Sequence, residues 1–301
     1  MNIAPIALFV YNRPKHTKQT VAALQNNKLS QDSNLFIFSD GPRKKEDEKK
    51  VKEVRNYIKS ITGFKNIIID EKEKNQGLAD SIVNGVTKII NKYDKIIVLE
   101  DDIVTFPYFL EYMNDALEIY KNELRVMHIA GYFFPVKNNL PETFFFNQAS
   151  CWGWATWKHA WKYFNNNAET LYQKIKEKKL IKKFNIDGSK PNLEQQLIDN
   201  INKNNKTWAI KWYANILLSN GLCLHPNKSL IRNIGFDGSG ENCKNSNNII
   251  NNFYNKKIIV KKTELKENLN ARKIAKNFYN KSSLKFSEKI KVYIKKILKN
   301  L

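Results

Sequence analysis

Blocks of apolar and polar residues alternate along the first 125 residues of the chain. Short apolar runs predict strands, and they lie at residues 3–11, 35–38, 66–70 and 95–99. Stretches typical of helices lie between or after them, at residues 14–24, 45–60, 78–91 and 107–120. Because strands and helices alternate, we predict an α/β fold with a mainly parallel central sheet that helices cover.

Polar residues directly follow three of the predicted strands. They are Asn12-Arg13, Ser39-Asp40 and the acidic run Glu100-Asp101-Asp102. Ligands of parallel α/β sheets bind at the carboxyl ends of the strands. The pattern therefore places a candidate ligand site where these three groups meet.

Beyond residue 125 the pattern becomes irregular and rich in aromatic residues. Aromatic segments lie at residues 132–135, 144–146 and 151–157, helical stretches at 168–184 and 208–218, and a Gly-rich loop at 235–240. Aromatic side chains either fill a core or stack on sugar rings. We expect Trp157 and Trp161 to be core residues, and for Trp152 and Trp154 both interpretations stay open.

The charge of the chain is strongly unbalanced, with 51 Lys+Arg against 29 Asp+Glu and a net charge of +22. Acidic partners such as nucleic acid, phosphorylated substrates or an anionic membrane would suit this excess, although compositional bias explains part of it. Residues 284–301 place apolar residues on one helical face and lysines mostly off it. This basic C-terminal amphipathic helix either binds an anionic membrane surface or packs on the main domain.

Targeting signals are not recognisable in the sequence. The apolar run at residues 3–11 is too short for a signal peptide, and no stretch has the roughly 18–20 apolar residues of a membrane helix. The three cysteines are odd in number and lack zinc spacing, which favours a reducing compartment. We therefore expect a cytoplasmic protein, with peripheral attachment to the inner face of the cytoplasmic membrane as an option.

The three adjacent acids call for a compensating charge, because like charges repel and burial makes each of them costlier. Carboxylates at a strand end can hold Mg²⁺ or Mn²⁺ through oxygen ligands and leave positions open for phosphate. Such a cation stabilises a diphosphate leaving group. A solvated acidic loop is the simpler alternative, but the preceding buried strand favours a divalent-cation site.

Several motifs in order resemble N-acetylglucosaminyltransferase I and the bacterial GT-A glycosyltransferases similar to it. They are Val-Tyr-Asn-Arg-Pro (10–14), Phe-Ser-Asp-Gly (38–41), Asn-Gln-Gly-Leu-Ala (75–79), Val-Leu-Glu-Asp-Asp (98–102), Trp-Gly-Trp (152–154), Trp208 to Trp212, and the stretches 224–229 and 233–240. The resemblance covers roughly residues 5–243. It implies a GT-A, Rossmann-like nucleotide-diphospho-sugar transferase fold. A nucleotide-sugar half would span residues 1–125, an acceptor and catalytic half 126–250, and a basic tail 251–301.

The resemblance also implies roles for single residues. Asp102 would bind the metal, Asp101 the ribose, and Glu100 would face the donor sugar. Arg13 and Asp40 would contact the base, next to Tyr11 and Asn75, and Trp152 and Trp154 would contact the acceptor. From the residues alone, Arg13 could instead be a surface charge before a helix, and Asp40 a turn former.

One departure from the family pattern concerns the catalytic base. The eukaryotic enzymes place an Asp directly after the Trp that corresponds to Trp208, whereas this chain has Ala209. An inverting transfer needs a carboxylate to accept the proton of the attacking hydroxyl. Asp237 in the Gly-rich loop and Glu194 ahead of the Trp208 helix are the candidates, with Asp237 preferred, although an ordinary Asp-Gly turn explains Asp237 equally well.

We therefore expect a metal-dependent glycosyltransferase of the hexosyltransferase type. It would move a sugar from a nucleotide-sugar donor, a UDP-sugar first, to a hydroxyl of a glycan or lipid-linked saccharide in bacterial surface polysaccharide or glycoconjugate synthesis. The alternatives are a nucleotidyltransferase and a non-catalytic carbohydrate- or nucleic-acid-binding protein. The Gly-rich phosphate loop typical of the former is absent after the first strand, and no nucleic-acid recognition motif is present.

Overall fold

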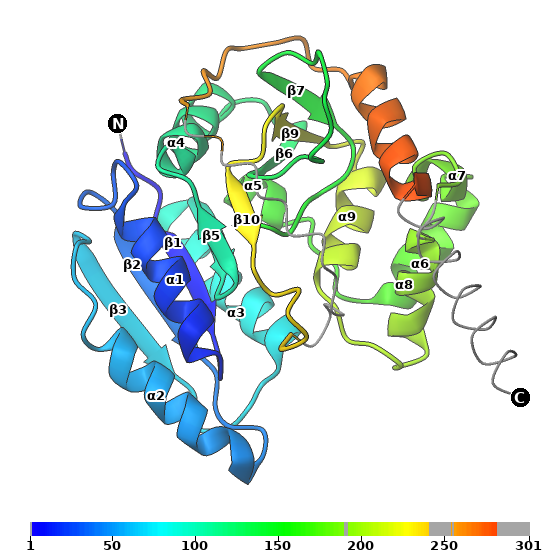
Figure 1. The fold of residues 1–301 in the computed structure, drawn as a ribbon. Helices are drawn as coiled ribbons and strands as arrows, with labels where there is room; N and C mark the ends of the chain where they lie inside the picture. Colours follow the sequence, from blue (N-terminus) through cyan, green and yellow to red (C-terminus); the bar gives the residue numbers. More distant parts are fainter. Residues whose placement is uncertain (1, 190–191, 241–253, 255, 282–301) are drawn as a thin grey trace, which may run out of the picture.

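The computed structural model describes residues 2–189, 192–240, 254 and 256–281. Within them the chain forms an eight-stranded sheet with helices on both faces and a separate two-stranded sheet (Figure 1). The predicted amphipathic helix at 284–301 lies outside the described residues.

Eight strands build the large sheet. Their order is β3 (Asn66–Glu71), β2 (Asn34–Ser39), β1 (Ile6–Val10), β4 (Lys95–Glu100), β8 (Trp154–Trp157), β6 (Val126–Ala130), β9 (Leu222–Pro226) and β7 (Thr143–Phe146). The first four strands in this order are parallel, and β6 and β9 are parallel to each other. The short strands β8 and β7 pair antiparallel with their neighbours. This arrangement confirms the predicted α/β fold with a mainly parallel sheet.

Helices cover both faces of this sheet. They are α1 (Pro14–Gln25), η1 (Lys45–Asp47), α2 (Glu48–Ile58), α3 (Leu78–Tyr93), α4 (Phe109–Ile119), α5 (Lys158–Trp161), α6 (Ala168–Glu177), α7 (Ile181–Phe184), α8 (Leu193–Ile201), α9 (Ala209–Leu218) and an unlabelled helix over residues 269–281. In β1, Ile6, Leu8 and Val10 pack with α1, α2 and α4, while Ala7 and Phe9 pack with α3 on the other face. Alternate residues of a strand point to opposite faces, so both faces of this strand must be apolar. This explains its continuous apolar run.

The small sheet joins the two halves of the chain near the acidic run. Strand β10 (Ile231–Asn233) pairs antiparallel with β5 (Ile103–Thr105), so that Asn233 lies opposite Ile103. The backbone N–H of Ile234 donates to the carbonyl oxygen of Asp102 at 2.9 Å. The Gly-rich loop that follows β10 is therefore held beside the carboxyl end of β4.

Residues 256–281 pack onto this domain, although the sequence analysis grouped them with a basic tail. Ile258 and Val260 are buried in the main core, and Ala271 and Ala275 of the 269–281 helix are buried against α6, α8 and α9. Figure 1 shows this helix in orange beside α7. Among the helices described, none combines the length and the hydrophobicity that a membrane crossing needs.

Candidate active site

A pocket with a cavity volume of about 430 Å³ opens at the carboxyl ends of β1, β2 and β4. The predicted donor-side and metal residues Tyr11, Arg13, Asp40, Asn75, Glu100, Asp101 and Asp102 line it together with Trp152, Trp208 and Ala209. Further lining residues come from segments 43–47, 206–210 and 239–240. The structure thus brings the three strand-end groups together, as expected for parallel strands.

Arg13 is the positive charge that compensates the acidic run. Its Nη1 donates to Asp102 Oδ2 at 3.0 Å and its Nε to Asp101 Oδ2 at 3.3 Å, while Nη2 contacts Asp101 Oδ1. The two aspartates are only 3% and 6% exposed. Burial lowers the pKa of Arg13, but the two carboxylates outweigh burial and raise it above its usual value. Arg13 therefore stays charged and holds both aspartates in place.

Glu100 lies at the end of β4 without such a partner. Burial, followed by the charges of Asp102 and Asp101, raises its pKa to about 8, although Arg13 and a hydrogen bond from the Trp208 side chain act in the opposite direction. The raised pKa favours the protonated carboxyl group, which faces the pocket from the same strand end as the two aspartates.

Asp40 organises the loop that carries Asn75. Its Oδ1 accepts from the backbone N–H groups of Gly41 and Gln76, at 2.9 and 2.8 Å, and its Oδ2 accepts from that of Gly77 at 2.9 Å. Asn75 Nδ2 donates to the carbonyl oxygen of Gly41 at 2.8 Å. These bonds tie the ends of β2 and β3 to the start of α3, and they fix the wall of the pocket.

The carboxyl end of β1 is held by Asp47, which the sequence analysis did not single out. Tyr11 Oη donates to Asp47 Oδ2 at 2.9 Å, and Asn12 Nδ2 donates to Asp47 Oδ1 at 2.8 Å. Asp47 lies in the charged run Arg-Lys-Lys-Glu-Asp-Glu-Lys-Lys at residues 43–50, where no signal separates it from its neighbours. The contact of the Trp208 side chain with Glu100 is also new, because the sequence suggests Trp208 only as part of a family motif and as the residue before Ala209.

The two tryptophans of the Trp-Gly-Trp segment lie in different environments. Trp152 lines the pocket and contacts Tyr132 and Phe236 edge to face, with ring centroids 4.6 and 5.5 Å apart. Trp154 is 1% exposed, because its ring stacks between those of His128 and Trp208. The structure therefore does not bring Trp154 to the pocket surface. Trp157 and Trp161 are buried core residues, as expected.

Neither candidate base lines the pocket. Asp237 accepts from the backbone N–H and hydroxyl of Ser239, at 3.0 and 2.6 Å, and its Oδ2 lies 3.2 Å from His16 Nε2. The hydrogen bonds from Ser239 lower the pKa of Asp237. Glu194 accepts from Tyr172 Oη at 3.0 Å and from Asn185 Nδ2 at 3.2 Å. Both carboxylates therefore have local partners, and Asp237 lies two residues from Ser239, which does line the pocket.

The residues present at the strand ends suit a divalent cation without forming a preformed cage. The described residues contain no group of three or more His, Cys, Asp or Glu side chains that could hold a metal ion. Asp101 and Asp102 offer carboxylate oxygens, the ligand type that Mg²⁺ and Mn²⁺ prefer, and Mg²⁺ is usually bound through one or two carboxylates plus substrate phosphates. Arg13 now neutralises these carboxylates, so a cation would compete with it.

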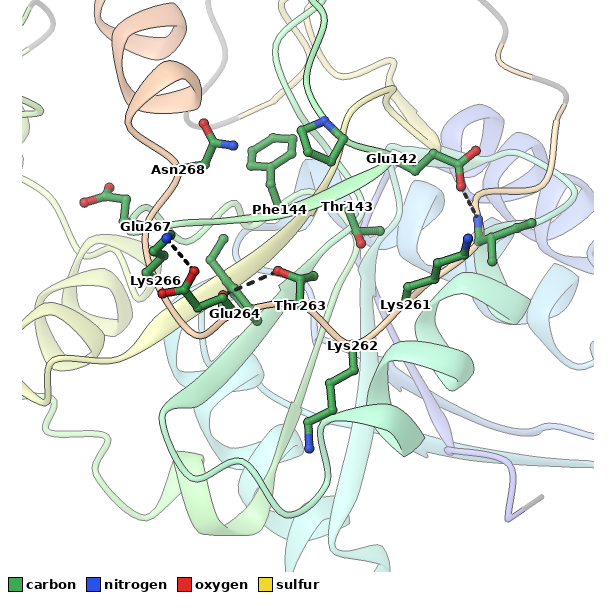
Figure 2. A pocket seen from close by; sticks show the side chains of 13 residues that line it. Glu142, Thr143, Phe144, Lys261, Lys262, Thr263, Glu264, Lys266, Glu267 and Asn268 are labelled. Carbon is green, nitrogen blue, oxygen red and sulfur yellow. Dashed lines mark hydrogen bonds and ion pairs between the residues drawn. The ribbon is translucent and has the colours of Figure 1, made fainter.

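A second cavity, of about 530 Å³, lies away from these residues, between β7 and the 259–268 segment. Figure 2 shows its mixed charges: Glu142 accepts from the backbone N–H of Ile259 at 3.2 Å, and Lys266 forms an ion pair with Glu264. None of the predicted site residues lines this cavity. Lys262 and Glu267 pair with Glu123 and Arg272, which lie outside the lining, so we assign this cavity no ligand.

Comparison with known proteins identifies the family. The model of glycosyl transferase family 2 matches residues 6–181, which is more than half of the chain and includes every strand end that lines the pocket. No curated protein matches the chain. Among solved structures, TarS of S. aureus is similar with 12% identity and a TM-score of 0.31 over 46% of this chain and 23% of that chain.

Two further solved structures have similar sequence identities and TM-scores. A mannosyltransferase from Pyrobaculum calidifontis, in complex with GDP-Man and Mn²⁺, has 10% identity and a TM-score of 0.37 over 52% of this chain and 47% of that chain. A UDP-glucose pyrophosphorylase complexed with UDP-glucose has 10% identity and a TM-score of 0.36, over 76% and 93%. The chain thus spans less than half the length of TarS and of the mannosyltransferase. It belongs to glycosyl transferase family 2 and has the GT-A fold.

Proposed function

We propose that the protein transfers a sugar from a UDP-sugar to a hydroxyl of a glycan, with inversion at the anomeric carbon and with a divalent cation, Mn²⁺ or Mg²⁺. The observation that carries this proposal is the pair of nearly buried aspartates at the end of β4, inside the pocket that β1 and β2 also line. A buried acidic pair is costly unless a positive charge compensates it, and carboxylates with shifted pKa values in a cleft are typical of functional sites.

The donor would lie across the carboxyl ends of the strands. Tyr11, Arg13, Asp40 and Asn75 would surround the base, as predicted, while Asp101 would bind the ribose. The hydrogen bonds of Asp40 to the backbone of residues 41, 76 and 77 support a role in shaping this subsite. Direct contact of Arg13 and Asp40 with the base stays a prediction.

The diphosphate would lie next to Asp102, which would hold the cation. When bound, the cation neutralises the phosphates and stabilises the leaving group. Arg13 would then have to release Asp102, because its Nη1 donates a hydrogen bond to one of the carboxylate oxygens, Oδ2. Glu100 would face the donor sugar, and as a protonated carboxyl group it could donate a hydrogen bond to a sugar hydroxyl.

The acceptor would enter on the side of Trp152, whose ring is held by Tyr132 and Phe236. A proton must leave the acceptor hydroxyl as it attacks the anomeric carbon. We keep Asp237 as the preferred base, because the adjoining Ser239 and Gly240 line the pocket. Glu194 is the weaker candidate, since Tyr172 and Asn185 engage its carboxylate away from the pocket lining. A role for Trp154 would require its stacked ring to become exposed.

The setting we propose is the synthesis of bacterial surface polysaccharide or a glycoconjugate, on a membrane-bound or lipid-linked acceptor. The basic residues and the apolar face at 284–301 in the sequence support contact with an anionic membrane. A flotation assay with anionic liposomes tests this. Deletion of residues 282–301 is expected to abolish flotation, and unchanged flotation would refute membrane attachment through this segment.

The experiment that tests the function is a thermal-shift panel of UDP-, GDP-, CMP- and dTDP-sugars, each with and without Mn²⁺. A ligand that binds the native state raises the melting temperature by mass action. We expect a metal-dependent rise with UDP-sugars that is lost in Asp102→Ala and kept in Asp32→Ala, an exposed control. No rise with any donor would refute the proposed site.

Turnover separates catalysis from binding alone. Release of UDP in the presence of acceptor glycans would establish transfer, whereas donor binding without turnover would favour the non-catalytic alternative that Ala209 suggests. Retention of nucleic acid at physiological ionic strength, without any response to nucleotide-sugars, would favour the nucleic-acid alternative.

A further inference from the structure

Asp47 connects the turn before α2 to the residues that follow β1. Its two carboxylate oxygens accept from different side chains, Oδ2 from Tyr11 Oη at 2.9 Å and Oδ1 from Asn12 Nδ2 at 2.8 Å. Tyr11 Oη in turn accepts from the backbone N–H of Arg43 at 2.9 Å. All four residues line the proposed nucleotide pocket, and Asp47 is only 9% exposed.

Helix capping does not explain this carboxylate. Asp47 occupies the N-cap position of α2, where an Asp side chain commonly accepts from the first backbone N–H groups of the helix. Its backbone is helical, with φ −80° and ψ −23°, because it is also the last residue of the 3₁₀ turn η1, and its side chain makes no capping hydrogen bond. Both oxygens instead accept hydrogen bonds from Tyr11 and Asn12, which follow β1.

An ionised carboxylate only accepts hydrogen bonds, so it decides which end of a neighbouring amide faces it. Hydrogen bonds from Tyr11 and Asn12 lower the pKa of Asp47 against the effect of burial, which keeps the group ionised at neutral pH. The amide of Asn12 must therefore direct Nδ2 towards Asp47 and Oδ1 away from it. Among the described residues, no donor contacts this Oδ1. An oriented acceptor is thus left on a residue that lines the pocket.

The carboxylate of Asp40 is less available than the Asn12 amide to accept a hydrogen bond from a ligand. Its oxygens already accept three backbone N–H groups, those of Gly41, Gln76 and Gly77. The Tyr11 hydroxyl is likewise engaged as donor and acceptor, which leaves its ring face for the base. Among the described residues at this strand end, Asn12 therefore offers a side-chain acceptor, Oδ1, to which no donor is hydrogen-bonded.

We propose that Asp47 sets the base specificity of the donor site by orienting the Asn12 amide, whose Oδ1 then accepts a hydrogen bond from a ring N–H of the base. Uracil N3 and guanine N1 carry such a hydrogen, whereas cytosine N3 and adenine N1 are acceptors. The latter bases would place two acceptors face to face. This inference rests on the proposed function, because it assumes that the nucleotide binds in this pocket.

The test compares nucleotides of equal ring size, UDP with CDP and GDP with ADP, by calorimetric titration in the presence of Mn²⁺. With CDP, the acceptor Oδ1 of Asn12 would face the acceptor N3 of cytosine, and a buried acceptor without a donor lowers the binding free energy. We therefore expect the wild type to bind UDP at least about tenfold more tightly than CDP. In Asp47→Asn the new amide can either accept from or donate to Asn12, so the Asn12 amide is no longer held in one orientation. The ratio of the UDP and CDP affinities is therefore expected to fall to within about threefold. The exposed control Asp32→Asn should keep the wild-type ratio.

A second variant covers the case in which Asp47→Asn does not fold. Asn12→Ala removes the acceptor while Asp47 keeps Tyr11, and it is expected to lose the same discrimination; Tyr11→Phe keeps the ring and should retain part of it. Equal binding of UDP and CDP by the wild type would overturn the inference, as would an unchanged ratio in both Asp47→Asn and Asn12→Ala. Absence of binding by every nucleotide would instead overturn the proposed function.

Discussion

Arg13 shows how one side chain resolves the conflict in the acidic run. Three adjacent carboxyl groups at the end of an apolar strand are unfavourable, and the guanidinium of Arg13 reaches two of them at once. The sequence predicted that something must compensate these charges and favoured a divalent cation, and it placed Arg13 at the end of another predicted strand. That the two strand ends are adjacent follows from the parallel pairing of β1 with β4.

Replacement of Arg13 by Ala is expected to lower the free energy of unfolding by about 3 kcal/mol at pH 7, because it leaves buried charges without their partner. Burial raises the pKa of Asp101, and the cost of leaving this carboxylate ionised without Arg13 should therefore be smaller at about pH 5 than at pH 7. Urea denaturation at both pH values measures this.

Lys15→Ala, at an exposed position of α1, the helix that begins directly after Arg13, is the matched control and should change little. Mn²⁺ is expected to restore part of the stability of Arg13→Ala, because a bound cation would replace the lost positive charge. An equal loss at low and neutral pH would show that packing, not charge, is the main contribution of Arg13.

The contribution of Glu100 to the free energy of unfolding is expected to change with pH in the opposite direction from that of Arg13. Its pKa of about 8 in the folded protein lies above the ordinary value of 4.5. The folded state therefore holds a proton that the unfolded state releases, and the resulting stability is present below pH 4.5 and is lost as the pH rises through 8. Glu100→Gln imitates the protonated form and should remove this loss, on the order of 2 kcal/mol between pH 5 and pH 9. Parallel slopes of unfolding free energy against pH for both proteins would contradict the shifted pKa.

At the scale of elements, an ion-pair cluster fastens the 269–281 helix to the domain. Arg272 donates to both oxygens of Asp187 at 2.9 Å, to Glu267 Oε1 at 3.0 Å and to the carbonyl oxygen of Lys183 at 3.0 Å. Glu267 also accepts from the backbone N–H of Asn147. The cluster thereby links this helix to α7 and to the segment that leads from β7 towards Trp152.

Arg272→Ala is expected to cost about 3 kcal/mol of unfolding free energy, because Arg272 is 7% exposed and its carboxylate partners would lose their counter-charge. The 269–281 helix should also become sensitive to limited proteolysis. Lys273→Ala changes an exposed neighbour and should leave both properties unaltered. Resistance of Arg272→Ala to protease would mean that the apolar contacts of Ala271 and Ala275 suffice.

At the scale of the whole molecule, the domain extends beyond the family match at residues 6–181. β9 completes the sheet, β10 holds the Gly-rich loop, and buried side chains continue to Ala275. A chain that ends at residue 253 would lose the burial of Ile258 and Val260 as well as the 269–281 helix. We expect its free energy of unfolding to fall by at least about 3 kcal/mol.

A chain that ends at residue 281 keeps every buried contact described above and is the matched comparison. Thermal and urea unfolding of the two chains measure the difference. Equal stability of the two would show that residues 254–281 pack on the domain without supporting it.

The sequence by itself determined the alternation of strands and helices, the mainly parallel sheet and the meeting of the strand-end groups at one pocket. Each of these follows from local periodicity and from the rule that parallel strands present their carboxyl ends at one edge. Arg13 and the three acids could be named for that reason.

Only the tertiary structure decided the surroundings of the other residues. Trp152 and Trp154 are equivalent in a local pattern, but the packing of His128 and Trp208 buries one of them and leaves the other in the pocket. Asp47 is one charge among many in its segment, and it gains its role from Tyr11 and Asn12, 36 and 35 residues earlier in the chain. Local sequence does not specify such partners, because they are set by how distant elements pack.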